Sequence, residues 1–177
     1  VLRNNSVTDT LQFSTVTSTL AAGNNPGFIS MGDVNSDGKK DLLVSNGSAN
    51  TISVIRNTTN TPANMTFATK VDIATGINPR GNCLQDLDGD GRPDIIVVNN
   101  SANTVSLLRN TGTSGISFAP KVDFATGTSP QRVVATDLDG DGKADIVTSN
   151  SSGGNISVFR NITTGTTLNL DTRTDIA

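Results

Sequence analysis

The sequence predicts an all-β protein made of small repeated sheets. Composition is the first observation behind this prediction, because 34% of the 177 residues are hydrophobic, below the roughly 45–50% of a typical globular domain. Thr, Asn, Ser and Gly are abundant instead, and these residues favour turns and short strands over helices. Pattern is the second observation: short apolar stretches alternate with turn residues, and the 3.6-residue period of an amphipathic helix is absent.

An internal repeat is the third observation. Three segments align with one another without gaps: residues 25–57, 78–110 and 129–161. The first Asp of an acidic run recurs after 53 and then after 51 residues. Each unit contains four short apolar stretches separated by turn residues, as expected for a small antiparallel sheet. In the last unit the predicted strands are residues 131–136, 144–149, 155–160 and 168–176.

Stacking of these sheets follows from their size, because a single four-stranded sheet cannot bury both of its faces alone. Radial stacking gives a β-propeller, and we predict about three and a half four-stranded antiparallel blades in this chain. A linear β-solenoid is the alternative, but its coils usually have shorter periods. The predicted units are a partial blade of two outer strands at residues 1–24 and full blades at residues 25–76, 77–127 and 128–177.

The predicted strands differ in their solvent exposure. Residues 94–99, the second stretch of the second unit, are continuously apolar between their end residues, as in a strand covered on both faces. The fourth stretch of the first unit alternates and carries Lys70 and Asp72 on one face, which is typical of an outer strand with one wet face. Asn82 interrupts the first stretch of the second unit, where the first unit has Ile29.

Each full unit carries one acidic loop of the pattern Asp-x-Asp-x-Asp-Gly-x-x-Asp, with one Asn substitution in the first unit. Side-chain oxygens at loop positions 1, 3, 5 and 9 and the backbone carbonyl at position 7 can surround one hard cation, and Gly at position 6 permits a positive φ. Five or six protein oxygens on a flexible loop suit calcium better than magnesium. The predicted ligands of three calcium sites are Asp33, Asn35, Asp37, Lys39 and Asp41, then Asp86, Asp88, Asp90, Arg92 and Asp94, and then Asp137, Asp139, Asp141, Lys143 and Asp145.

The charge distribution also favours a bound cation. Asp, Asn and Gly are common in turns that bind nothing, but three copies with the same spacing argue against that interpretation. The loops hold eleven of the 16 Asp residues, so strong repulsion is expected without a cation. Asn35 removes one charge from the first loop and is expected to weaken its site.

The loop pattern alone could also belong to an EF-hand or a dockerin. Those motifs need a bidentate carboxylate at loop position 12, where this chain has Val44, Val97 and Thr148. The repeats instead resemble the FG-GAP/VCBS repeats of integrin α-subunit propellers and of many secreted bacterial proteins. This resemblance implies that each loop joins the innermost strand of a blade to the second strand and that its calcium ion is structural.

An Arg-Asn pair follows the third apolar stretch of every unit. We expect each pair to hold a strand end or a neighbouring blade through hydrogen bonds, and a ring of ligand-binding guanidinium groups is the alternative. The four arginines are Arg3, Arg56, Arg109 and Arg160.

Missing residue types exclude several functions. The chain has no His and a single Cys, Cys83, so it cannot assemble a Ser/His/Asp or Cys/His nucleophile, a typical zinc site or an internal disulfide. The Asp residues outside the loops show no convergent pattern, so we do not expect an enzyme. A net charge of −3 without a basic cluster excludes a nucleic-acid footprint, and the apolar runs are too short for membrane insertion.

These observations predict a calcium-stabilised, non-catalytic β-propeller module that binds a protein or glycan ligand on a cell surface or matrix. We expect it to be secreted and to work outside the cell or at the cell surface, where free calcium is plentiful. A lectin-type propeller and an accessory domain of a secreted polysaccharide-active enzyme are the alternatives. Closed propellers have about 4–8 blades, so further blades of the same array, or a second copy of the chain, are expected partners.

Overall fold

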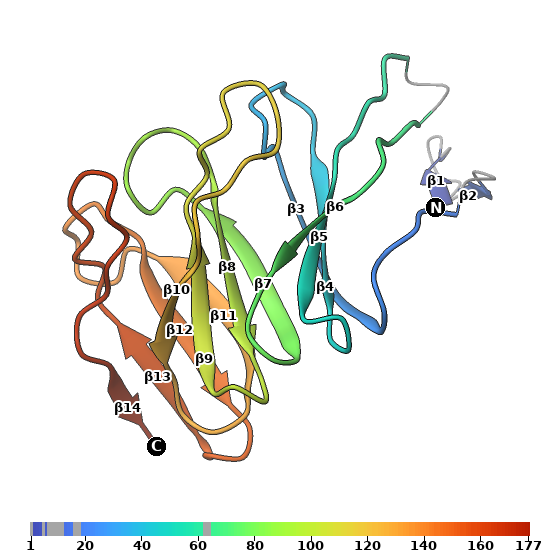
Figure 1. The fold of residues 1–177 in the computed structure, drawn as a ribbon. Helices are drawn as coiled ribbons and strands as arrows, with labels where there is room; N and C mark the ends of the chain where they lie inside the picture. The colour runs from blue at the N-terminus through green and yellow to red at the C-terminus, as the bar shows by residue number, and fades with distance from the viewer. Residues whose placement is uncertain (1, 5, 7–12, 16–18, 62–64) are drawn as a thin grey trace.

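The computed structural model describes residues 2–4, 6, 13–15, 19–61 and 65–177. These residues form three four-stranded antiparallel sheets and one two-stranded sheet, and they contain no helix. The sheets stand next to one another without closing into a ring (Figure 1). The predicted all-β class with four-stranded antiparallel blades is therefore confirmed, as a partial propeller.

Strand order follows chain order in every blade. The first blade contains β3 (Pro26–Gly32), β4 (Asp41–Asn46), β5 (Thr51–Ile55) and β6 (Val71–Ala74). The second contains β7 (Pro79–Gln85), β8 (Asp94–Asn99), β9 (Thr104–Leu108) and β10 (Val122–Ala125). The third contains β11 (Pro130–Thr136), β12 (Asp145–Asn150), β13 (Asn155–Phe159) and β14 (Thr174–Ile176). The two-stranded sheet pairs β1 (Leu2–Asn4) with β2 (Phe13–Thr15).

The fourth strand of the third blade is shorter than the predicted 168–176. Leu170 forms an isolated bridge with Asn161, and regular pairing with β13 starts only at Thr174. Between them the Asp171 carboxylate accepts a hydrogen bond from the Thr172 backbone amide at 2.7 Å. The Asp171 backbone amide still donates to the Arg160 carbonyl at 2.9 Å, so the pairing is interrupted only between Asp171 and Thr174.

The first strands of the three blades lie side by side, with β7 between β3 and β11. Gly81 in β7 makes the approach to β11 possible, because a Cβ atom there would lie 2.7 Å from the carbonyl oxygen of Gln131. The Arg132 guanidinium of β11 also reaches the Phe28 ring of β3, 4.3 Å from its centroid. The inner strands therefore pack closely along one side of the molecule.

Two hydrophobic cores fill the spaces between blades, and β8 contributes to both. Ile95 and Val97 point into the core shared with the first blade, whereas Ile96 and Val98 point into the core shared with the third. All six residues of β8 are buried. The prediction that residues 94–99 form a strand covered on both faces is confirmed, because a blade packs against each face.

The outer strand β6 is exposed at three of its four residues, Asp72 included, as its sequence predicts. The Asp72 carboxylate also accepts a hydrogen bond of 2.6 Å from the hydroxyl of Ser53 and pairs with Lys70. Ser53 lies directly opposite Asp72 in the antiparallel register and is fully buried. The same Ser–Asp contact joins Ser106 to Asp123 and Ser157 to Asp175.

Asn82 in β7 forms a polar bridge to the first blade. Its amide donates hydrogen bonds to the Ser45 hydroxyl at 2.7 Å and to the Phe28 carbonyl at 3.4 Å, and its side-chain oxygen accepts one from Ser30. The interruption in the inner strand is therefore a satisfied polar contact between blades. The neighbouring Cys83 packs against the other core, and burial raises the pKa of its thiol to about 12.

Candidate metal centres

The three acidic loops connect β3 to β4, β7 to β8 and β11 to β12, so each joins the inner strand of a blade to its second strand. Position 6 has a positive φ in every loop, 82° at Gly38, 83° at Gly91 and 85° at Gly142, as predicted. Position 4 also has a positive φ, a feature beyond the predicted loop pattern. It is Gly in the second and third loops but Ser36 in the first, where φ is 59°.

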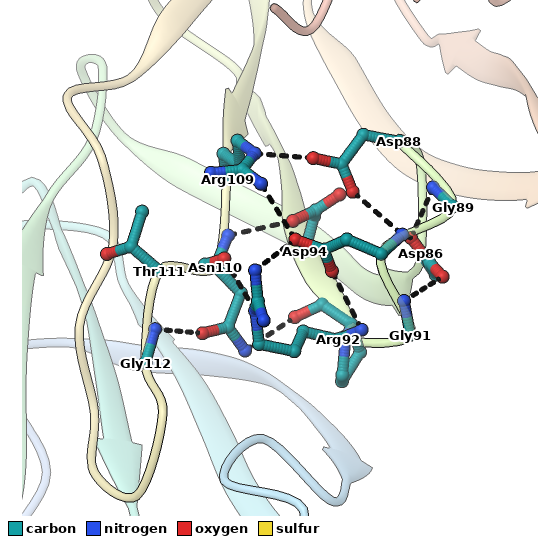
Figure 2. A network of polar contacts seen from close by, with 12 residues as sticks. Asp86, Asp88, Gly89, Gly91, Arg92, Asp94, Arg109, Asn110, Thr111 and Gly112 are labelled. Carbon is teal, nitrogen blue, oxygen red and sulfur yellow. Dashed lines mark hydrogen bonds and ion pairs between the residues drawn. The ribbon is translucent and has the colours of Figure 1, made fainter. Parts of the chain in front are cut away.

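The Asp at position 1 organises each loop from within. The two oxygens of Asp86 accept hydrogen bonds from the backbone amides of Gly89 and Gly91, both at 2.8 Å (Figure 2). Asp137 makes the matching contacts in the third loop, and Asp33 accepts from Asp37 and Gly38 in the first. The curled loop therefore turns its amides toward this carboxylate.

The Asp at position 9 is buried and ties the loop to the end of the third strand. Asp94 accepts hydrogen bonds from the backbone amides of Leu87 at 3.0 Å and Asn110 at 2.8 Å. Burial raises the pKa of Asp94 to about 6, although these two hydrogen bonds oppose the shift. Asp41 and Asp145 make the same pair of contacts, and burial also raises the pKa of Asp41.

The carboxylates at positions 3 and 5 bind an arginine from the end of the third strand. Arg109 donates from Nε to Asp88 and from a terminal nitrogen to Asp90 at 2.8 Å (Figure 2). Arg160 donates to Asp139 at 2.5 Å and to Asp141 at 3.0 Å, and its hydrogen bond lowers the pKa of Asp139. Recurrence of these arginines predicts contacts with strand ends or neighbouring blades, and it gives no sign of their contact with the loops.

Position 7 was predicted to supply a backbone carbonyl from Lys39, Arg92 and Lys143, and that role stays a prediction. Each of these residues donates its backbone amide to the Asp at position 5, at 2.9 Å in all three loops. Their side chains reach the connection after the third strand. Lys143, for example, donates to the Thr163 carbonyl at 2.9 Å.

Carboxylate oxygens converge in the second and third loops. Asp86, Asp88 and Asp94 each place an oxygen within 4.8 Å of the others, and Asp137, Asp139 and Asp145 do the same. Such a set of hard oxygen donors fits a divalent cation. These clusters leave out Asp90 and Asp141, the residues at position 5, and their position-3 members bind the same arginines.

The first loop offers a different donor set, because Asn35 replaces an Asp. The Asn35 amide donates to Asp37 at 3.2 Å, while its side-chain oxygen is buried and has no hydrogen-bond partner in the described part of the chain. A buried oxygen without a donor is costly, and a cation would satisfy it. The residues of this loop therefore also fit a hard cation, with one charge fewer.

The loops lie at the seams between blades. The Asn110 amide of the second blade donates to the Val34 carbonyl in the first loop at 2.8 Å, and the Asn161 amide of the third blade donates to Leu87 in the second loop at 3.0 Å. The Asn110 and Asn161 side chains thus hold the preceding blade, as predicted, whereas Asn57 donates to Lys40 in its own blade. Between the second and third loops lies a cleft of about 390 Å³, lined by residues such as Asp88 and Lys143.

Comparison with known proteins agrees with this geometry. The model of the FG-GAP-like repeat family matches residues 33–97 and 86–148, and each match begins at the first Asp of an acidic loop. The chain belongs to the FG-GAP-like repeat family. The FG-GAP resemblance seen in the sequence is therefore confirmed, and no curated protein matches the chain.

One solved structure similar to this FG-GAP repeat chain is described as the crystal structure of BBS1N in complex with ARL6DN, soaked with lead. The two chains share 14% sequence identity with a TM-score of 0.45, and the alignment covers 81% of this chain. This chain spans 42% of the length of that one. Among the described residues, no helix is long and apolar enough to cross a membrane.

Proposed function

We propose that this chain is a calcium-stabilised, non-catalytic FG-GAP propeller module. The observation that carries the proposal is the convergence of three carboxylate oxygens within 4.8 Å in the second and again in the third loop. Calcium accepts the irregular shell of 6–8 oxygens that a curled loop can offer, whereas magnesium requires near-octahedral geometry and retains water. Calcium is therefore the cation that this donor set favours.

The ion would neutralise carboxylates that the fold holds close together. Asp86, Asp88 and Asp94 would bind it in the second loop, with Asp90 and the Arg92 carbonyl completing the predicted shell. The equivalent residues would do so in the other two loops. Because the first and second loops also anchor the next blade through the Asn110 and Asn161 amides, an ion bound in either loop would stabilise both its blade and the seam to the next blade.

Removal of calcium should lower the stability of the protein. If each site binds at about 10 μM and free calcium is about 1 mM, the stabilisation is roughly 2.7 kcal/mol per site. Thermal melts in EDTA should therefore give a Tm many degrees below the Tm in calcium, and magnesium at the same concentration should recover little of it. A melt that is identical in EDTA and in calcium would rule out the structural role.

We also propose that the module displays its loops to a protein ligand outside the cell or at its surface, where calcium is abundant. A cleft of about 390 Å³ between the second and third loops offers acidic, amide and lysine groups to such a ligand. A glycan is the second candidate, but sugar rings commonly stack on Trp or Tyr and the chain has neither. Calcium-dependent pull-down with matrix proteins, next to a glycan array, separates these two ligand classes.

The exposed face of the third blade supports a proposal about what packs against it. Leu138 is 54% exposed, whereas the equivalent Val34 and Leu87 are 1% and 3% exposed because the following blade covers them. Ile156 is 38% exposed, whereas the equivalent Ile52 and Val105 are fully buried. We propose that a further blade of the same kind covers this face and presents an Asn amide to the Leu138 carbonyl. A second copy of the chain is the alternative partner.

A further inference from the structure

The guanidinium group of Arg109 binds two carboxylates of the second loop at once. It reaches Asp88 through Nε and Asp90 through a terminal nitrogen, the latter at 2.8 Å. The side chains of Arg109 and Asp88 are only 15% and 1% exposed, so their attraction is weakly screened by water. Figure 2 shows the contact between Arg109 and Asp88 as a dashed line.

The third blade repeats the arrangement. Arg160 binds Asp139 at 2.5 Å and Asp141 at 3.0 Å. Here the side chains are more exposed, 52% for Arg160 and 39% for Asp139. We expect the exposed pair to contribute less than the pair of the second blade.

The first blade supplies a natural contrast. Its third loop position is Asn35, and the guanidinium group of the equivalent arginine, Arg56, makes no hydrogen bond or ion pair with any residue that the structure describes. Arginine is present in all three blades, but it binds the loop only where position 3 carries a charge. The contact therefore depends on the carboxylate and is not required to end the third strand.

These arginines provide part of the positive charge that the acidic loops need. The second loop places four Asp residues within nine positions, and such close carboxylates repel each other strongly where water is limited. A guanidinium that bridges two of them reduces this repulsion without a metal. The same positive charge repels a divalent cation that uses the same carboxylates.

We propose that Arg109 and Arg160 are internal counter-ions that hold the second and third loops in the metal-free protein and oppose cation binding there. The second half of this proposal rests on the proposed calcium function. The arginines oppose cation binding through thermodynamic linkage. A group that stabilises the metal-free loop more than the metal-bound loop must weaken the metal affinity by the same factor. The structure describes no such arginine bridge in the first loop.

A double-mutant cycle in EDTA tests the first half without calcium. Arg109→Met should lower the Tm by about 2–4 °C or more, and adding Asp88→Asn should restore part of the loss by removing the unpaired charge. Arg56→Met is the matched control and should change the Tm little. Additive effects of the two substitutions would overturn the proposal.

Calcium titration by calorimetry tests the second half. Arg109→Met should tighten the affinity of one site about fivefold, at the lower end of typical coupling between two binding events. If Arg109 only supported the loop, its removal would weaken calcium binding. Unchanged or weaker calcium binding by Arg109→Met therefore overturns the proposal that Arg109 opposes the cation. If Arg109→Met fails to fold, the exposed Arg160→Met and the charge-conserving Arg109→Lys replace it, and Arg109→Lys should keep most of the repulsion.

The two proposals fail in different ways. Suppose that Arg109 and Asp88 are coupled in EDTA but the unaltered protein binds no calcium. This result would refute both the calcium function and the opposition of the arginines to cation binding, while their counter-ion role would stand. Calcium binding without coupling between Arg109 and Asp88 would refute this inference and leave the calcium function intact.

Discussion

Asn82 shows how a single polar residue can be built into the packing between blades. Its side chain satisfies the fully buried Ser45 hydroxyl and also contacts Ser30 and Phe28 of the neighbouring inner strand. Apolar residues occupy the same position in the other two blades. This position therefore accepts a polar or an apolar side chain, provided that the residues facing it in the neighbouring blade have the same polarity.

Asn82→Leu should destabilise the protein although it makes the strand more apolar. The substitution leaves the Ser45 hydroxyl buried without a partner, at a cost of about 1–3 kcal/mol, measurable as a lower midpoint in urea denaturation. Combining it with Ser45→Ala should recover part of the stability, because both polar partners are then absent. A midpoint that rises in Asn82→Leu alone would contradict this account.

Gly76 is required by its close approach to Asn99. A Cβ atom on Gly76 would lie 2.6 Å from the Asn99 side-chain carbon Cγ, and the Gly76 amide donates to the Asn99 oxygen at 3.0 Å. Gly76→Ala should therefore cost about 0.5–3 kcal/mol in unfolding free energy. Gly115→Ala is the matched control, because a Cβ there meets no atom within 4 Å. Equal stability of the two variants would disprove the steric argument.

At the scale of elements, the acidic loop and the Arg-Asn pair form one joint. The buried Asp at position 9 binds the loop to the third strand of its own blade, and the Asn amide binds the loop of the preceding blade. The loop is thus fixed on two sides before any metal is considered.

Asn110→Ala should weaken the seam between the first two blades. It removes the hydrogen bonds to the Val34 carbonyl at 2.8 Å and to the Pro93 carbonyl at 3.1 Å, both from a fully buried side chain. The expected loss is about 1–3 kcal/mol, with faster amide hydrogen exchange in β4 and β8. Asn57→Ala is the control, because among the described residues the Asn57 amide donates only to the Lys40 carbonyl of its own blade. Exchange that is unchanged at the seam would refute the joint.

At the scale of the whole molecule, the blades form an open stack. Each space between blades is filled by a hydrophobic core to which both neighbours contribute. The face of the third blade carries apolar residues at the same repeat positions without a cover. An uncovered face of this kind is typical of an interaction surface.

The isolated chain should therefore self-associate or bind a hydrophobic dye through the third blade. Leu138→Lys together with Ile156→Lys should reduce both effects, measured by light scattering over a range of concentrations and by dye fluorescence. Ile77→Lys is the control, because Ile77 is also exposed but lies in the connection between the first two blades. A strictly monomeric chain that binds no dye would contradict the proposal.

The sequence by itself determined the repeat, the all-β class and the position of the acidic loops, and its family resemblance implied the strand order. These features depend on local chemistry: alternation or continuity of apolar residues specifies strands, and Gly91 or Gly142 specifies the turn that curls the loop. The buried β8 strand could be predicted for the same reason, since its apolar run is continuous.

The tertiary structure alone decided which side chains meet. Arg109 binds Asp88 from 21 residues away, and Asn110 binds the Val34 carbonyl from 76 residues away, in the preceding blade. The sequence showed that these residues recur, but recurrence does not specify direction or partner. Partners across a seam are set by how two sheets pack in space, and that packing is a property of the assembled blades rather than of any local segment.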